Sequence, residues 1–263
     1  MSSLSSPTSQ SNEADPVAPP ELSVVIPFYN EALNIPPLLA ELRATVEKLG
    51  LVAEVIAVDD GSKDETFATL TEQAEKWPAV RIVRLPRNRG QAVALWRGFE
   101  QVRAPWIATM DGDGQNPPSE LARLWERRHE ADMLVGARQG RKDSLGRKIM
   151  SRIANGVRRT LLRDGVSDSG CALRLFRCEV RASLPPLRTL YSFIPACAVS
   201  GGWKVREVPV AHRPRVAGTA NYTFRKMALM PFLDTLAFCW VLRRMLDLSP
   251  AADRPDSKVK KSE

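Results

Sequence analysis

The sequence predicts an α/β fold, in which a mainly parallel sheet carries helices on both faces. Short runs rich in Val and Ile alternate along the chain with longer amphipathic stretches, as strands and helices do in βαβ units. Polar and acidic residues directly follow three of these runs, at the strand ends where open parallel sheets bind ligands. With 44% hydrophobic and 26% charged residues, the 263-residue chain has a globular composition, which excludes collagen, coiled-coil and wholly disordered proteins.

Each apolar run in the first half predicts a strand, and each stretch with helical periodicity predicts the helix that follows it. In chain order, the expected strands are 22–29, 54–61, 80–86, 105–113 and 132–138. The expected helices between them are 33–49, 64–76, 90–102 and 118–130. Two later runs, CALRLFR at 171–177 and VREVPVAHRPR at 205–215, predict further strands.

We expect one main domain with short appendages. Residues 1–20 are rich in Ser and Pro and predict a disordered tail, without the basic start and apolar run of a secretory signal. Residues 21–222 form the main domain, 223–247 an amphipathic helix and 248–263 a charged tail.

The net charge of +8 and the pI near 9.6 indicate an anionic partner, such as a nucleotide, a phosphate group or an acidic membrane surface. Nucleic acid is not expected, because no binding motif is present and only 6% of residues are aromatic. The four cysteines are widely spaced without a CxxC pair, which predicts neither a zinc site nor a disulfide framework and fits the cytosol.

The segment Met227–Leu242 is apolar but too short to span a membrane, because Pro231 and Asp234 interrupt it. Apolar residues recur on one of its faces at helical spacing: Leu229, Leu233, Leu236 and Trp240. Basic pairs flank it at 225–226 and 243–244, as in helices that lie in a membrane interface. It is either such a helix, which makes the protein peripheral on the cytoplasmic face, or a terminal helix packed on the core.

The motif Asp111-Gly-Asp113 follows an apolar strand, which places two carboxylates at its tip. Two such carboxylates can bind one hard divalent cation and so neutralise a diphosphate, whereas an isolated motif of this kind is more often an acidic turn. Asp59-Asp60 ends another strand and PFYNE, at 27–31, ends the first. Together, these three strand ends predict a nucleotide pocket.

Four blocks resemble the N-terminal half of glycosyltransferase family 2, which has the Rossmann-like GT-A fold: VVIPFYNE, VDDGSKDET, RNRGQAVALWRGFE and DGDGQNPP. The resemblance extends over residues 22–245 and is closer to the polyprenol-phosphate sugar transferases, typified by dolichyl-phosphate mannosyltransferase and bacterial undecaprenyl-phosphate enzymes. It implies an inverting, Mg²⁺- or Mn²⁺-dependent transfer of a sugar from a GDP- or UDP-linked donor to a polyprenyl phosphate.

The resemblance also implies roles for individual residues. Those expected to bind the nucleotide-sugar are Pro27, Tyr29, Glu31, Val58, Asp60, Asp111, Gly112, Asp113, Arg138 and Arg215. Asp113 and Gln115 are expected to bind the metal, and Arg147 and Ser151 the acceptor phosphate. The catalytic group is then Asp111, Asp113 and Arg215, without a general base, because a lipid phosphate is already an anionic nucleophile.

The chain departs from the family pattern after Gly218, where Ala220-Asn221 replaces the usual Ser-Lys and removes a cation. Two alternatives stay open. A related enzyme that glycosylates a saccharide or another hydroxyl group needs a base, for which Asp168 is the candidate. A non-catalytic module that binds nucleotide-sugars is the other. The sequence leaves open the sugar, the choice between GDP and UDP, the polyprenol and the oligomeric state.

Overall fold

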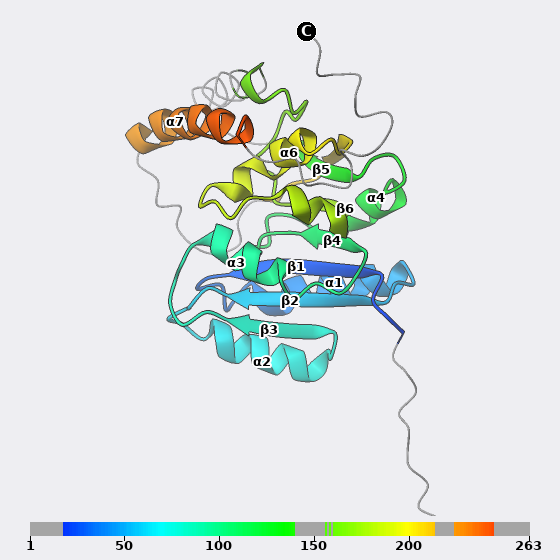
Figure 1. Ribbon diagram of the computed structural model, residues 1–263. Helices are drawn as coiled ribbons and strands as arrows, with labels where there is room; N and C mark the ends of the chain where they lie inside the picture. The colour runs from blue at the N-terminus through cyan, green and yellow to red at the C-terminus, as the bar shows by residue number, and fades with distance from the viewer. Residues whose placement is uncertain (1–17, 140–155, 157, 159, 214–223, 245–263) are drawn as a thin grey trace, which may run out of the picture.

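The computed structural model describes residues 18–139, 156, 158, 160–213 and 224–244, with the side chains of 224–232 left out. A seven-stranded sheet in this described part has the order β3-β2-β1-β4-β6-β5-β7 (Figure 1). Its strands are β1 (Leu22–Phe28), β2 (Ala53–Asp59), β3 (Val80–Arg84), β4 (Trp106–Thr109), β5 (Met133–Arg138), β6 (Arg174–Arg177) and β7 (Val205–Val210).

The sheet is mainly parallel. β1 pairs in parallel with β2 and β4, β2 with β3, and β5 with β7. Only β6 runs against its neighbours β4 and β5 within the described sheet, so it begins where they end. In this register Arg174, the first residue of β6, pairs with Thr109, the last residue of β4.

The helices cover both faces of the sheet, as the sequence predicts. They are α1 (Ile35–Lys48), α2 (Thr66–Lys76), α3 (Gln91–Phe99), α4 (Glu120–Glu126), α6 (Leu190–Ser200) and α7 (Phe224–Leu242), with a 3-10 turn at Cys178–Ser183. The mainly parallel α/β fold is therefore confirmed, and the helices α1, α2, α3 and α4 are each shorter than expected.

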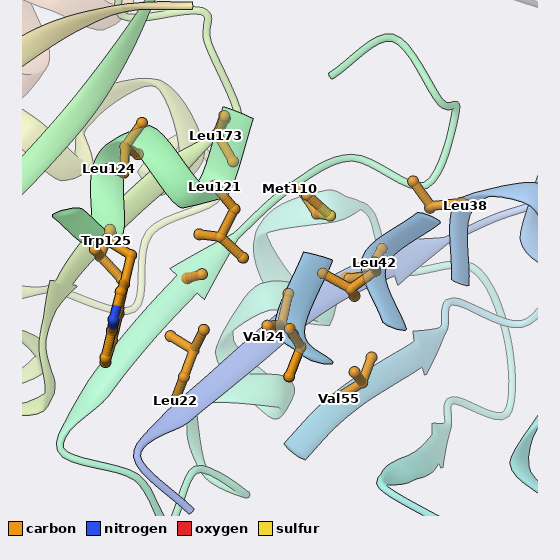
Figure 2. Close-up of a cluster of buried hydrophobic side chains, with 14 of the residues drawn as sticks. Leu22, Val24, Leu38, Leu42, Val55, Met110, Leu121, Leu124, Trp125 and Leu173 are labelled. Atoms are coloured by element: carbon orange, nitrogen blue, oxygen red, sulfur yellow. The ribbon is translucent and has the colours of Figure 1, made fainter. Parts of the chain in front are cut away.

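Successive side chains of each strand point to opposite faces, so the core has two halves. Leu22 and Val24 of β1 pack with Leu38 and Leu42 of α1 and with the buried face of α4 (Figure 2). Val25, which follows Val24 in the sequence, belongs to the second half of the core with α3 and α6. The sheet is thus buried on both faces, and ligands have access to its edges and ends.

Helix α6 was not among the sequence expectations. Its sequence, LYSFIPACAVS, is apolar on nearly all sides and contains Pro195, so it lacks the periodicity of an amphipathic helix. Most of its side chains are buried because the helix lies between the sheet and α7. Phe193 of α6 stacks on Phe238 of α7, with ring centroids 4.2 Å apart.

Helix α7 turns one face to α6 and leaves the other uncovered. Thr235 and Phe238 are buried, whereas Leu233, Leu236 and Trp240 are 46%, 42% and 59% exposed. No helix in the described part of the chain has both the length and the apolar character to cross a bilayer.

Candidate active site

Four chain segments with polar or charged residues lie at the carboxyl edge of the sheet. β1, β2, β4 and β5 all point the same way, so the residues after Phe28, Asp59, Thr109 and Ala137 lie along this edge. Because β6 is antiparallel, Arg174 enters the sheet at the same edge. The sequence prediction that the first three strand ends share one crevice follows from this register.

The loops after β1 and β2 are joined by backbone-to-side-chain hydrogen bonds. Asn30 N donates to Ser62 Oγ at 3.0 Å, and Lys63 N donates back to Asn30 Oδ1 at 2.9 Å. Glu31 N donates to Thr66 Oγ1 at 2.9 Å. Asn30 has a φ of 54°, a left-handed conformation that Asn tolerates better than most residues. These bonds hold the loops after β1 and β2 together at the carboxyl edge.

The residues expected to contact a nucleotide differ in exposure. Tyr29 is 39% exposed, and Pro27 and Glu31 are half-buried, so all three side chains are accessible at the rim. Val58 is fully buried in the core half that contains α3. Its side chain packs near Gly98, where an added Cβ would come within 3.3 Å of it. The Val58 side chain is therefore part of the core beside α3.

Asp60 is 3% exposed, and its carboxylate oxygens accept hydrogen bonds from the N–H groups of Arg89 and Gly90, both at 2.8 Å. Burial raises the pKa of Asp60 and the charge of Asp59 adds to this, while the two N–H bonds oppose it. Asp60 therefore fastens the turn before α3 to the end of β2. Gly61 fits the same packing, because a Cβ there would lie 2.3 Å from the carbonyl carbon of Arg87.

Asp111 lies just beyond β4 and accepts a hydrogen bond from Gln91 Nε2 at 2.6 Å. Burial, followed by the charge of Asp113, raises the pKa of Asp111 to about 6, although Arg174 and Arg138 lower it. The two carboxylates of the DGD motif are thus close enough to repel each other. Gln91, at the start of α3, was not singled out from the sequence.

Gly112 is required by close packing, because a Cβ at this position would lie 2.4 Å from Phe28 Cδ1 and 2.9 Å from the Pro27 carbonyl oxygen. The DGD motif therefore lies directly against the end of β1. Asp113 is 7% exposed, and its Oδ1 accepts a hydrogen bond from Gln115 N at 3.1 Å. The backbone just after the motif thus bonds to the second of its two carboxylates, that of Asp113.

The residues present fit a hard divalent cation. Two mutually repelling carboxylates and the amide oxygen of Gln115 are oxygen donors, which Mg²⁺ and Mn²⁺ prefer. The described residues contain no cluster of three or more His, Cys, Asp or Glu side chains able to hold a metal. A cation at Asp113 would accordingly take its remaining ligands from an amide, from water or from a bound phosphate, as is usual for Mg²⁺.

Arg138 ends β5 and forms a two-point ion pair with Asp168. Its Nε and Nη2 donate to the two carboxylate oxygens, each at 2.7 Å, and its backbone N donates at 3.2 Å. Both side chains are 15% exposed. Burial opposes the charge of Arg138, but the bonds from its guanidinium to Asp168 raise its pKa. The carboxylate that the sequence offered as a possible base is thus bound to an arginine.

Arg174 is a site residue that the sequence analysis did not identify. It is 1% exposed, and Nη2 donates to the carbonyl oxygens of Ser169 (3.1 Å) and Tyr191 (2.9 Å). Burial lowers its pKa, which the charges of Asp111 and Asp168 partly offset. A single arginine inside the apolar run CALRLFR was the available signal, because a buried charge in a strand needs nearby counter-charges.

Three expected site residues, Arg147, Ser151 and Arg215, lie outside the described residues, as does the departure at Ala220-Asn221. The chain just before Arg215 is described. Arg213 N donates to Gln115 O at 2.9 Å, and its guanidinium donates to both oxygens of Glu41, at 2.7 and 3.1 Å. The segment after β7 is therefore attached beside the DGDGQ loop at residue 213.

Comparison with known structures supports the fold. Glucosyl-3-phosphoglycerate synthase from Mycobacterium tuberculosis, in complex with Mn²⁺, UDP and phosphoglyceric acid, superimposes with a TM-score of 0.66 at 20% identity, over 84% of this chain and 78% of that chain. A mannosyltransferase from Pyrobaculum calidifontis, in complex with GDP-Man and Mn²⁺, gives a TM-score of 0.62 at 20% identity, over 89% and 70% of the chains.

Comparison of sequences identifies the family. The chain is 38% identical to an undecaprenyl-phosphate 4-deoxy-4-formamido-L-arabinose transferase from Enterobacter sp., over 83% of this chain and 67% of the relative. It is 37% identical to the enzyme of that name from Pseudomonas paraeruginosa, over 83% and 64%. The chain thus spans about two thirds of the length of these relatives. The family model for glycosyl transferase family 2 matches residues 23–184, and the chain therefore belongs to that family.

Proposed function

We propose that this protein transfers a sugar from a nucleotide-sugar to a polyprenyl phosphate of the undecaprenyl type, with inversion at the anomeric carbon. The observation that carries the proposal is the carboxyl edge of the sheet, where Asp111 and Asp113 follow β4, Arg138 ends β5 and the buried Arg174 begins β6. Such an edge suits a metal-bound diphosphate. Relatives that share 37–38% identity with the chain are named as undecaprenyl-phosphate sugar transferases, which supports the acceptor.

Asp113 and Gln115 would hold Mg²⁺ or Mn²⁺, which would supply charge neutralisation for the leaving diphosphate. Asp111 would orient the donor, since Gln91 fixes one of its oxygens. The rim residues Tyr29 and Glu31 are accessible to a nucleoside. Structures of similar fold contain UDP together with Mn²⁺ or Mg²⁺, which supports the cofactor.

We assign Pro27 and Asp60 to the wall of the nucleotide pocket and Gly112 to the close approach of the DGD motif to it. Arg138 and Arg215 would offset charge on the diphosphate, and Arg147 and Ser151 would orient the acceptor phosphate. A lipid phosphate needs no base to attack, so the enzyme needs mainly to bring two anions together.

The ion pair between Asp168 and Arg138 favours the lipid-phosphate acceptor over a saccharide. A general base must offer a free oxygen to the hydroxyl group from which it takes a proton. Both oxygens of Asp168 already accept hydrogen bonds from the Arg138 guanidinium. Asp168, the base that a hydroxyl acceptor would need, is therefore already bonded to Arg138.

We also propose that α7 lies in the interface of the membrane that holds the acceptor. Leu233, Leu236 and Trp240 form an uncovered apolar face, and Arg243 and Arg244 at its end are exposed, as in helices that bind anionic bilayers. The four cysteines are free, which supports the reducing, cytoplasmic side of the membrane.

Cosedimentation with vesicles containing anionic lipid tests this orientation. Leu236→Glu should weaken vesicle binding about tenfold, because a charge replaces an apolar side chain that would be buried in the membrane interface. Val52→Glu, at an exposed position on the opposite edge of the sheet, is the matched control and should bind as the wild type does. Equal binding by all three proteins would contradict the role of α7.

The activity itself is tested with purified protein, Mn²⁺, undecaprenyl phosphate and a panel of UDP- and GDP-sugars, with glycolipid detected by mass spectrometry. Product with one donor would establish the reaction and identify the sugar. No product with any donor, in a preparation that binds nucleoside diphosphate by calorimetry, would contradict the lipid acceptor and favour a hydroxyl acceptor.

A further inference from the structure

Asp168 has no task in the proposed transfer, yet the structure gives it strong and specific contacts. It is a largely buried carboxylate at the edge of the sheet, and it is bound by both the side chain and the backbone of Arg138. A buried carboxylate is costly to desolvate unless its position is useful or its bonds repay the cost. Both of its side-chain oxygens accept hydrogen bonds from the Arg138 guanidinium, so Asp168 can fix the orientation of that arginine.

The geometry of the pair leaves part of the guanidinium available. An arginine has five N–H donors in a rigid fork, and Asp168 takes one from Nε and one from Nη2. Within the described part of the chain, no hydrogen bond from Nη1 of Arg138 is found. One edge of the fork is therefore fixed by a carboxylate, while the other edge can donate to a second anion.

The loop that carries Asp168 is itself held from two strands. Glu207 of β7 accepts hydrogen bonds from Ser167 N at 2.7 Å and from Asp168 N at 3.0 Å, and its other oxygen accepts one from Ser167 Oγ at 2.8 Å. Arg174 of β6 binds the Ser169 carbonyl oxygen from the other side. The loop that carries Asp168 is thus held to the sheet by hydrogen bonds to β6 and β7.

Gly170 shows that the loop is closely fitted to the arginine. A Cβ at this position would lie 2.9 Å from Arg138 Nη2 and 3.7 Å from Asp168 Oδ1. A side chain there would displace the guanidinium or break the pair. The absence of a side chain at Gly170 and the placement of Asp168 therefore serve the same orientation of Arg138.

Arg138 fixed in this way points to a phosphate site. It ends β5 at the same edge of the sheet at which Asp111 follows β4. We propose that Asp168, held by Glu207, is a positioning residue that fixes one edge of the Arg138 guanidinium so that the other edge binds a phosphate oxygen of a substrate. The inference rests on the proposed function, because the phosphate comes either from the nucleotide-sugar or from the lipid acceptor.

A double-mutant cycle tests the inference through binding alone. Calorimetry with UDP and with GDP in the presence of Mn²⁺ would compare wild type, Asp168→Asn, Arg138→Ala and the double variant. If the phosphate belongs to the donor, we expect Asp168→Asn to weaken binding of UDP or GDP about tenfold, as for loss of one charge-assisted contact. In the Arg138→Ala background the same change should cause no further loss, since Asp168 acts through Arg138. An equal loss in both backgrounds would overturn the proposal.

Kinetics distinguish the source of the phosphate. If Arg138 binds the donor, Asp168→Asn raises KM for the nucleotide-sugar; if it binds the acceptor, binding of UDP and GDP is unchanged and KM for undecaprenyl phosphate rises instead. Either result supports positioning. A fall in kcat with both KM values unchanged, together with loss of the acidic limb of the pH–rate profile, would identify Asp168 as a base and overturn the proposal.

Glu207→Gln provides a second variant that does not touch the arginine. Its amide oxygen still accepts hydrogen bonds but lacks the charge, so we expect the same KM to rise about threefold, less than in Asp168→Asn. Unchanged melting temperatures would show that both variants fold. If the wild type neither binds a nucleoside diphosphate nor forms product, the proposed function fails; if it does both and Asp168→Asn matches it, only this inference fails.

Discussion

The two edges of the sheet use carboxylates in opposite ways. At the amino edge, Glu54 accepts hydrogen bonds from Ser23 Oγ at 2.6 Å, Arg81 Nη1 at 2.7 Å and Arg103 N at 2.8 Å. Although burial opposes this, these bonds keep the pKa of Glu54 below its ordinary value. At the carboxyl edge, burial and Asp113 raise the pKa of Asp111 to about 6.

The difference separates structure from function within one sheet. Protein donors occupy both oxygens of Glu54, so its negative charge stabilises the fold. Asp111 and Asp113 repel each other at the opposite edge, and this electrostatic cost would be relieved by a cation. Carboxylates at the two edges of one sheet can thus be told apart by the donors that the fold supplies.

The largest expected effect comes from removing a carboxylate at the carboxyl edge. Asp113→Ala should reduce glycolipid formation about 1,000-fold, equivalent to about 4 kcal/mol, because the metal loses a charged ligand. The free energy of unfolding, measured in urea, should not fall, since a like-charge repulsion is removed. Normal turnover by this variant would refute the metal site.

The matching change at the amino edge should act on stability alone. Glu54→Gln should lower the free energy of unfolding by about 2 kcal/mol. A neutral amide is a poorer acceptor for Arg81, and its NH₂ group would face donors that now bond to the carboxylate. Transfer activity at 20 °C should stay within about twofold of the wild type, as the site lies at the other edge. An activity loss as large as that of Asp113→Ala would break the distinction between the edges.

A smaller effect is expected from Gln91, which orients Asp111. Gln91→Ala should lower kcat/KM about tenfold, or about 1.4 kcal/mol, because Asp111 loses the hydrogen bond that fixes its Oδ1. Gln101→Ala, at an exposed position near the amino edge, is the control and should be neutral. Similar kinetics for the two variants would show that Asp111 needs no orientation by Gln91.

The smallest effect concerns pH and follows from Glu54. Since its folded-state pKa lies below the ordinary value, its contribution to stability is present above pH 4.5 and is lost as the pH falls through the folded-state pKa. The difference in unfolding free energy between wild type and Glu54→Gln should therefore narrow below pH 4.5. A constant difference from pH 7 to pH 3 would exclude this ionised network.

Much of the edge could be predicted because it depends on local pattern. The runs that form β1, β2 and β4 end where polar residues begin, so parallel pairing brings PFYNE, DDGS and DGDG together. Arg174 and α6 were not predicted for the site or the fold. The antiparallel insertion of β6 between β4 and β5 joins segments distant in sequence, and a helix that is buried nearly all round has no amphipathic period.

The sequence by itself determined the alternation of strands and amphipathic helices in the first half of the chain and the chemistry of the strand ends, because periodicity and residue type are local properties. Only the tertiary structure decided how each polar group is used. Asp60 binds the backbone of Arg89 and Gly90, and Asp168 binds Arg138, across separations of 29 and 30 residues. Whether a carboxylate accepts backbone hydrogen bonds, neutralises an arginine or binds a metal depends on the donors around it. Those donors are brought next to it only when the chain folds.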